Sequence, residues 1–463
     1  MMKKQDSYKP ILILLAILFL LLVVFPGPIQ AYTLVWEVTS GSGVIYAITA
    51  DDDYIYVTGS NYRVEKYRKS DGNLEWKYPG SDGTARGIAQ DDDYVYVSGI
   101  ETVSSGGGNT NFGIRVQKHR KSDGGLEWTY SYDPCNDADS VDNSRAITAD
   151  AGASGYIYIG GTDATPPGHE NMQWHITKRR KDNSATGGWV AIGLFSVGWD
   201  EVRSMASDND YIYVGGHDNV NGLNTERARL EKRRKSNGSV VEWVQRYTRK
   251  SVYGIASDDD DNGYIYTAMV DGWNVKKHRK SDGVAEWEKS YSFPGSGERS
   301  EAICIDDDYV YLAGDDDIPG NNEWRIQKHR ISDGELVWEH TVNHSNSDEE
   351  AYAIIADSDP EGFIYIAGSD KMTGSSRWRI EKRKKVGHVD IGLRVYDQDL
   401  TEPIKIAAEP QGTLTSPLRI AKNGVVWGIV LIDSTDPKFG DPQYDSGVRI
   451  RTGSGDIKAL RKL

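Results

Sequence analysis

The chain has 463 residues, enough to bury a large core, and its 49 glycines, 27 tyrosines and 13 tryptophans are typical of an all-β protein. Its net charge of −15 argues against a nucleic-acid-binding protein, which would present a basic face.

Residues 1–31 have the features of an export segment. Lys3, Lys4 and Lys9 precede an unbroken apolar run, Ile11–Phe25, which ends at Pro26. This run is short for a membrane span and long for the core of a signal peptide. We expect a cleaved secretory signal, with an uncleaved N-terminal membrane anchor as the alternative. Either way, the rest of the chain is predicted to lie outside the cytoplasm, secreted or at the cell surface.

A motif of about 50 residues is repeated seven times between residues 33 and 386. Its clearest copy starts at Ala47–Gly59, which contains Tyr-Ile-Tyr, and continues as Arg63–Trp76. The lysine of this motif recurs as Lys66, Lys118, Lys178, Lys232, Lys277, Lys328 and Lys382. A tryptophan follows each of the first six lysines, as Trp76, Trp128, Trp189, Trp243, Trp287 and Trp338. None follows Lys382, and the seventh tryptophan, Trp36, precedes the first repeat.

Each repeat carries four short segments of alternating polarity, separated by Asp-Asp-Asp and Ser-Asp-Gly turns. This pattern predicts one four-stranded blade per repeat, and therefore a seven-bladed β-propeller over residues 32–386. Residues 33–38 would complete the blade formed by residues 352–384 and leave no open edge. The alternative is a linear β-solenoid, which should have unusual capping repeats in place of complementary ends.

The charges of the repeat are predicted to compensate one another. Basic clusters such as Arg68-Lys69 end the third strand, and turns such as Asp51–Asp53 should emerge on the same face. This arrangement favours a ring of internal ion pairs over a site for polyanions.

Residues 387–463 break the period and predict a small β-rich module. We recognise no family in it.

The motif Tyr-Ile-Tyr-Val-Thr-Gly at residues 54–59, followed by Asp-Gly-Asn-Leu-Glu-Trp at 71–76, resembles the secreted β-propeller repeat called the SBBP type. It is also similar to the tryptophan-docking repeat of PQQ-like quinoprotein propellers. These resemblances imply a propeller fold. Quinoprotein dehydrogenases are typically eight-bladed and have an adjacent cysteine pair, which this chain lacks, so a quinone cofactor is not expected.

The sequence contains no Gly-x-Ser-x-Gly, His-Glu-x-x-His or phosphate-loop motif. His119, His278 and His329 occupy one repeat position, which indicates a structural role. The repeated lysine is also interpreted as structural, with its stem beside the tryptophan of the fourth strand and its charge over that ring.

The residue that enters the first strand of each repeat varies, in contrast to its neighbours, and should lie at the loop-bearing end of the central channel. These residues are Tyr46, Arg86, Arg145, Arg203, Tyr253, Glu301 and Tyr352. Arginine occupies this position in three consecutive repeats of an otherwise acidic chain. Three guanidinium groups at one place suit a carboxylate, a sulfate or an acidic sugar. The alternative is that the arginines pair with acids such as Asp139, Asp142 and Glu201.

Aromatic residues also recur where the third strand begins, as Trp174, Trp273, Trp324 and Trp378. Packing between blades is the simpler explanation. The functional alternative is a set of platforms on which sugar rings stack.

Two turns have the spacing of a calcium loop, with candidate ligands Asp258, Asp260 and Asn262 in one and Asp357, Asp359 and Glu361 in the other. The twelfth position is Met269 or Gly368, where a calcium loop requires glutamate. We therefore expect solvated turns, with calcium as the alternative and no other cofactor.

Together these features predict an exported binding or scaffold protein, whose partner is an acidic glycan or a cell-surface protein. The long connections between second and third strands should carry the binding surface together with the channel mouth. The alternative is an extracellular propeller enzyme: a lyase, a glycosidase or, less in keeping with the sequence, a quinoprotein dehydrogenase.

Overall fold

The computed structural model describes residues 33–385, except for segments 105–109, 134–141, 153, 165–171, 194–197, 220–225, 239–240, 249–250, 261, 271, 294–297, 318–319, 345–347, 360–361 and 373. It also describes six short strands after residue 386. All regular elements of these described parts are β-strands, as the composition predicts. The export segment lies outside the described residues.

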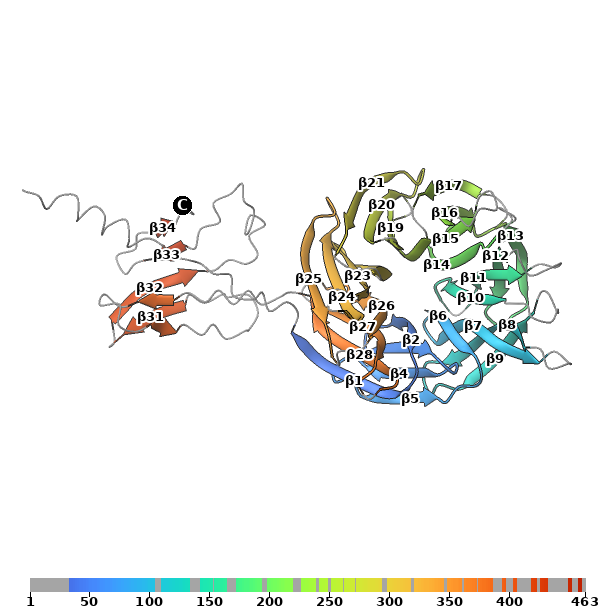
Figure 1. Cartoon of the computed structure of the whole chain (residues 1–463), viewed down its shortest axis with the longest axis horizontal. Coiled ribbons are helices and arrows are strands. Elements are labelled where there is room, and N and C mark those ends of the chain that lie inside the picture. The colour runs from blue at the N-terminus through green and yellow to red at the C-terminus, as the bar shows by residue number, and fades with distance from the viewer. Residues whose placement is uncertain are drawn as a thin grey trace, which may run out of the picture. The chain divides into compact units, whose positions relative to one another are not determined.

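Seven four-stranded antiparallel sheets form the blades of a propeller (Figure 1). We call the strands of each blade A to D, from the axis outward. Blade 1 contains β2 (Ile45–Ala50), β3 (Tyr54–Gly59), β4 (Val64–Arg68) and β5 (Leu74–Tyr78). Blade 2 contains β6 (Thr84–Gln90), β7 (Tyr94–Ser104), β8 (Thr110–Arg120) and β9 (Leu126–Tyr132). Blade 3 contains β10 (Asn143–Ala149), β11 (Tyr156–Ala164), β12 (Met172–Arg180) and β13 (Thr186–Gly193).

The remaining blades repeat this order. Blade 4 contains β14 (Glu201–Ser207), β15 (Tyr211–Asn219), β16 (Glu226–Arg234) and β17 (Val241–Tyr247). Blade 5 contains β18 (Ser251–Ser257), β19 (Tyr264–Val270), β20 (Trp273–Arg279) and β21 (Ala285–Tyr291). Blade 6 contains β22 (Arg299–Ile305), β23 (Tyr309–Asp316), β24 (Glu323–Arg330) and β25 (Leu336–Val342). Blade 7 contains β26 (Glu350–Ala356), β27 (Phe363–Asp370), β28 (Arg377–Lys384) and, as strand D, β1 (Leu34–Ser42).

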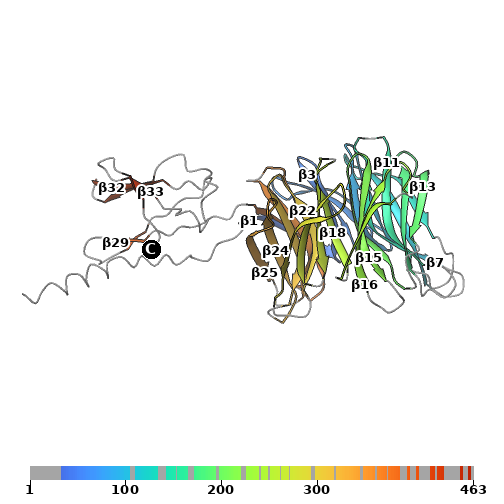
Figure 2. The same ribbon diagram turned by 90° about the horizontal axis from the view of Figure 1, so that it is seen from above.

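The ring closes as predicted. Strand β1 pairs with β28, so that Trp36 lies opposite Lys382, just as Trp76 lies opposite Lys66 in blade 1. Each strand A lies beside the strand A of the next blade, and β26 lies beside β2. Figure 2, which views the ring from the side, shows the strands running between its two faces. The A–B turns lie on one face, which we call the turn-bearing face, and the B–C connections lie on the other, the loop-bearing face.

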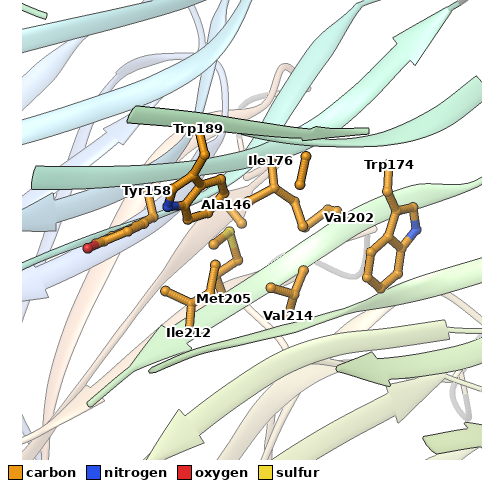
Figure 3. Close-up of a cluster of buried hydrophobic side chains, with 10 residues drawn as sticks. Ala146, Tyr158, Trp174, Ile176, Trp189, Val202, Met205, Ile212 and Val214 are labelled. Carbon is orange, nitrogen blue, oxygen red and sulfur yellow. The ribbon is translucent and has the colours of Figure 1, made fainter. Parts of the chain in front are cut away.

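The hydrophobic core is divided into seven clusters, each at one interface between neighbouring blades. Between blades 3 and 4, Trp189 and Ile176 of blade 3 face Met205 and Val214 of blade 4 (Figure 3). Burial of this apolar surface between neighbours is the main force that holds such a ring together.

The tryptophan of strand D docks onto the following blade. Its indole N–H donates a hydrogen bond of 2.8–3.3 Å to the main-chain carbonyl of one repeat position in the next blade. The acceptors, in chain order from the Trp36 bond onward, are Lys69, Lys121, Lys181, Lys235, Lys280, Ile331 and Lys385. All seven interfaces are therefore joined by the same bond, including the one at the point of closure.

The repeated lysine of strand C lies opposite this tryptophan, but the prediction for its charge is wrong. The ammonium group lies 3.6–3.9 Å from the ring centroid of the first aromatic residue of strand B, Tyr54 in blade 1. The strand-B ring lies next to strand C in the same sheet, so it is within reach of the lysine side chain.

Ion pairs join the blades on the turn-bearing face, which confirms the predicted internal compensation of charge. In six interfaces a lysine that follows strand C pairs, at 2.7–3.6 Å, with the first aspartate of the A–B turn in the preceding blade. The pairs are Lys69–Asp357, Lys121–Asp51, Lys181–Asp91, Lys235–Asp150, Lys280–Asp208 and Lys385–Asp306. In blade 6 the position is Ile331, so the interface between blades 5 and 6 has no such lysine.

The chain divides into a propeller unit, Ala31–Val386, and a second unit that contains the strands after residue 386. In the second unit, β29 (Arg394–Tyr396) pairs with β30 (Pro403–Lys405). A separate sheet has the order β31 (Leu418–Lys422), β32 (Val425–Leu431), β33 (Arg449–Arg451) and β34 (Ile457–Ala459). A search of the described residues for a helix of sufficient length and hydropathy to span a membrane finds none.

Candidate functional site

Each strand A carries a β-bulge at the variable residue. In blade 1 the register passes from Ile45–Gly59 directly to Ala47–Thr58, so Tyr46 is the extra residue. The same shift makes the extra residues Arg86, Arg145, Arg203, Tyr253, Glu301 and Tyr352 in the other blades. A bulge redirects the side chain of its extra residue, and bulges are frequent beside functional sites. We call these seven residues the bulge ring.

In six of the seven blades, the glycine that ends the Tyr-x-Tyr-x-x-Gly segment of strand B (Phe-x-Tyr in blade 7) lets strands A and B approach closely at the bulge. In six blades, a Cβ added to this glycine would lie 1.9–2.0 Å from the main-chain carbonyl oxygen two residues before the bulge. The glycines are Gly59, Gly99, Gly161, Gly216, Gly314 and Gly368. Only a residue without a side chain allows the two backbones to approach this closely. Blade 5 is the exception, since Met269 lies opposite Val252 at this position.

Contacts between neighbouring blades link the residues of the bulge ring. Arg145 and Arg203 both pair with Glu201, and the second pair has an N–O distance of 2.7 Å. The guanidinium of Arg203 also lies 4.3 Å from the ring centroid of Tyr253. Burial raises the pKa of Glu201, but the two arginines outweigh it and leave this pKa below its usual value. Glu201 is therefore the charged partner of both arginines.

Arg86 differs from the other two arginines. Its guanidinium lies 4.9 Å from the ring centroid of Tyr46, which in turn packs against Tyr352 at 5.0 Å. In the described part of the chain, no acidic side chain forms an ion pair with Arg86. Burial, and then the nearby charge of Arg145, lower the pKa of Arg86. The surroundings of Arg86 thus disfavour the positive charge that its guanidinium carries.

The opposite side of the ring is acidic. Burial raises the pKa of Glu301 to about 7, although Arg299 lies 4.0 Å away and acts in the other direction. Burial and the charges of Glu301 and Glu350 raise the pKa of Asp315 to about 8. Glu350 accepts a hydrogen bond from the hydroxyl of Tyr352. The bulge ring therefore has a cationic side in blades 2–4, whereas acidic side chains lie in it or next to it in blades 6 and 7.

The aromatic residues at the start of strand C belong to the core. Trp174, Trp273, Trp324 and Trp378 are all buried, with at most 1% of their surface exposed. The indole of Trp174 donates to the carbonyl of His217 in the next blade at 2.8 Å, and Trp324 donates to that of Ser369 at 3.1 Å. Their assignment as stacking platforms is wrong, because no ring face is accessible to a sugar.

The calcium-like turns already hold a cation. The ammonium of the buried Lys280 donates to the carbonyls of Asp258 and Asp260 at 2.6 and 2.8 Å and lies 3.1 Å from a carboxylate oxygen of Asp258. Lys385 binds the carbonyls of Asp357 and Asp359 in the same way. A calcium ion would have to displace these lysines, so the turns are filled by ammonium groups and not solvated. Asn262 donates its N–H to Asp260, and Glu361 lies outside the described residues.

A cavity of about 410 Å³ lies on the turn-bearing face between blades 1 and 2. It is lined by residues of the repeat, among them Asp51, Tyr54, Lys66 and Lys121. Lys121 pairs with Asp51 between the blades, and Lys66 lies over the ring of Tyr54 within blade 1, so the cavity follows from the repeat architecture. We place the candidate site at the bulge ring.

Trp199 is not among the site residues expected from the sequence. Of the 13 tryptophans, seven occupy the docking position, four begin strand C, and Trp427 belongs to the C-terminal residues. Trp199 is the remaining one, and 58% of its surface is exposed. Trp199 occupies neither the docking position nor the start of strand C, and this exception is visible in the sequence alone. Asp139, named as a possible arginine partner, lies outside the described residues, whereas Asp142 is described and buried.

Comparisons with known proteins agree with this architecture. Residues 32–241, from strand β1 to the first residue of β17, match a family model described as outer membrane protein assembly factor BamB. The solved structure of the WD40 β-propeller domain of Doa1 is similar in fold, with a TM-score of 0.50, 11% identity and coverage of 77% of this chain and 98% of that one. No curated protein matches the chain in sequence. The chain is a seven-bladed β-propeller, and its residues 32–241 are similar to the PQQ-like, BamB-type repeat family.

Proposed function

We propose that this protein is an exported binding protein, and that the bulge ring at the loop-bearing end of the propeller holds a ligand with an anionic group. A carboxylate or sulfate suits the forked donors of Arg86, Arg145 and Arg203, which can bind such a group through two parallel hydrogen bonds. An acidic sugar carries this group together with the hydroxyls that tyrosines recognise.

The observation that carries the proposal is the excess of arginine over acid on one side of the ring. Three guanidinium groups lie in blades 2–4, and the single carboxylate of Glu201 pairs with both Arg145 and Arg203, so the positive charges outnumber the negative one. The guanidinium of Arg86 lies over the ring of Tyr46 and forms no ion pair with an acidic side chain of the described residues, so it can bind an incoming anion. An anion bound there would offset the unfavourable burial of the Arg86 charge.

In this proposal, the protein acts outside the cytoplasmic membrane. This location is supported by the apolar segment Ile11–Phe25 after three lysines, and by the similarity of residues 32–241 to a family described as an outer membrane assembly factor. An acidic glycan or a cell-surface protein is the partner that fits this setting.

A second candidate is an extracellular enzyme such as a lyase or glycosidase. The observation in its favour is the raised pKa of Glu301 and Asp315, about 7 and about 8, since carboxyl groups that retain a proton near neutral pH serve as acids in catalysis. Turnover of a glycan that is lost in Glu301→Gln would establish this activity.

The test of binding is a glycan array followed by calorimetry on Arg86→Gln. We expect this variant to lose affinity for an acidic glycan at least tenfold while its stability stays within about 1 kcal/mol. The matched control is Arg120→Gln, an exposed arginine that pairs with Asp123. Replacing all three arginines is a poorer test, because the loss of Arg145 and Arg203 would leave the buried Glu201 unpaired. Equal binding by Arg86→Gln and wild type would contradict the proposal.

A further inference from the structure

Trp199 is presented on the loop-bearing face by a fixed backbone. The N–H of Met172 donates to the carbonyl of Gly198 at 3.0 Å, and the N–H of Asp200 donates to the carbonyl of Met172 at 2.9 Å. The carboxylate of Asp200 in turn accepts from the N–H of Asn219 at 2.7 Å. The residues on both sides of Trp199 are therefore anchored to blades 3 and 4, while its indole is exposed.

An exposed indole on a rigid backbone is unusual for a side chain with no role in packing. Tryptophan is rarely left open to solvent, and it is the residue most enriched among the anchors of binding surfaces. In the other blades, the position four residues before the bulge is Ser42, Asp82, Val141, Arg249, Gly297 or Asp348. The indole is thus specific to the seam between blades 3 and 4.

This seam is where the cationic side of the bulge ring lies. Trp199 precedes Glu201 by two residues and Arg203 by four, and Glu201 pairs with Arg145 of the neighbouring blade. Four residues of extended chain span at most roughly 14 Å between Cα atoms. The indole and the arginines are thus within reach of one oligosaccharide ligand.

We propose that Trp199 forms an outer subsite for the ligand of the bulge ring, and that this ligand is an acidic oligosaccharide of at least two rings. One ring places its carboxylate at Arg86 and its neighbours, and a later ring stacks its C–H face on the indole. The inference rests on the proposed function, since it assumes that an acidic glycan binds at the arginines.

The experiment measures how affinity depends on ligand length. Oligogalacturonates of one to four rings are titrated into the full-length protein by calorimetry, with the tryptophan fluorescence recorded in parallel. In the wild type we expect the affinity to rise at least tenfold between one ring and three, with a change in indole emission only for the longer ligands. Trp199→Ala should abolish both the rise and the emission change, and should bind the single ring as the wild type does.

Two variants separate this inference from the proposed function. Arg86→Gln should weaken every length by a similar factor. Met372→Ala, which removes another exposed apolar side chain from a B–C connection, should have no effect and serves as the matched control. Because both exposed side chains lie outside the core, the melting temperatures of their variants should equal that of the wild type.

The outcomes are distinct. Loss of binding in Arg86→Gln with an unchanged length dependence in Trp199→Ala would overturn the subsite and leave the proposed function standing. Unchanged binding in Arg86→Gln would reject both. Capture of a protein partner that depends on Trp199, with no affinity for any oligogalacturonate, would overturn the glycan subsite and assign the indole to a protein interface.

Discussion

Trp36 and Lys69 are hydrogen-bonded across the point where the ring closes, with 3.0 Å between the indole nitrogen and the carbonyl oxygen. The first residue belongs to blade 7 and the second to blade 1, and they lie 33 residues apart in the sequence. The same hydrogen bond joins the blades at each of the other six interfaces, so the ring closes through the contact that is used throughout.

Trp36→Ala should therefore destabilise the propeller about as much as the same change in the middle of the ring. We expect a loss of about 3 kcal/mol, since both an indole contact and a hydrogen bond are removed. Trp243→Ala, which breaks the equivalent bond to Lys280, is the matched variant. Chemical denaturation of both measures the effect. Deletion of residues 33–42 should lower the melting temperature more than removal of residues 387–463, and equal temperatures would contradict closure by β1.

Removal of the Lys280 ammonium should turn its loop into a cation site. We expect Lys280→Ala to lose about 3 kcal/mol of stability, because the carboxylates of Asp208 and Asp258 are left without their shared partner. Millimolar calcium should restore part of this stability and give a calorimetric signal, whereas the wild type should give none. Lys289→Ala, which removes a more exposed pair with Glu335, should not respond to calcium. Calcium binding by the wild type at micromolar concentration would show that the lysine does not occupy the site.

Stability should fall as the pH falls from about 6.5 to 4, in part through the repeated histidines. Burial lowers the pKa of His119, His278 and His329 to about 4, so the unfolded chain takes up protons first over this range. Each histidine costs up to about 3 kcal/mol at the acid end. His329→Gln should reduce the slope of unfolding free energy against pH.

His344 should act in the opposite direction. Burial lowers its pKa, but hydrogen bonds to Glu349 and Glu381 outweigh burial and raise it. Its contribution is complete below about 6.5 and is lost as the pH rises through the folded-state pKa. His344→Gln should therefore remove the gain in stability that the wild type shows as the pH falls through the folded-state pKa toward about 6.5, and should leave the slope below pH 6.5 unchanged. Identical slopes in the wild type and both variants would show that these histidines do not titrate as described.

Gly314→Ala should disturb the bulge of blade 6. The added Cβ would lie 1.9 Å from the carbonyl oxygen of Arg299, which the backbone must move to relieve. We expect a cost of about 1–3 kcal/mol. Gly87→Ala is the control, because its Cβ would first meet the Ser98 hydroxyl at 3.0 Å and four other blades have alanine at that position. A Gly314 variant as stable as the control would mean that the glycine is not required there.

The sequence was sufficient to predict the fold because the motif occurs seven times, once for each blade. The displaced Trp36 also shows how the two ends of the propeller meet. The positions of the bulge-ring residues could also be predicted, since these residues vary where their neighbours do not. The ion pairs that they form could not be predicted. Whether Arg145 meets Glu201 depends on the distance between two blades, and the Lys280 ammonium reaches the Asp258 loop only through the folded chain. The burial of Trp324 and the exposure of Trp199 likewise depend on what the next blade covers.

The sharing of blade 7 between the two ends of the propeller has a consequence for biogenesis. The partner of β1, strand β28, is made more than 300 residues later, so the sheet that seals the ring requires a contact between the most distant segments of the propeller. Contacts of such large sequence separation form slowly. During synthesis, the ring stays open until its last strand is available. Until then β1 has an unpaired edge, and such an edge is a template for aggregation.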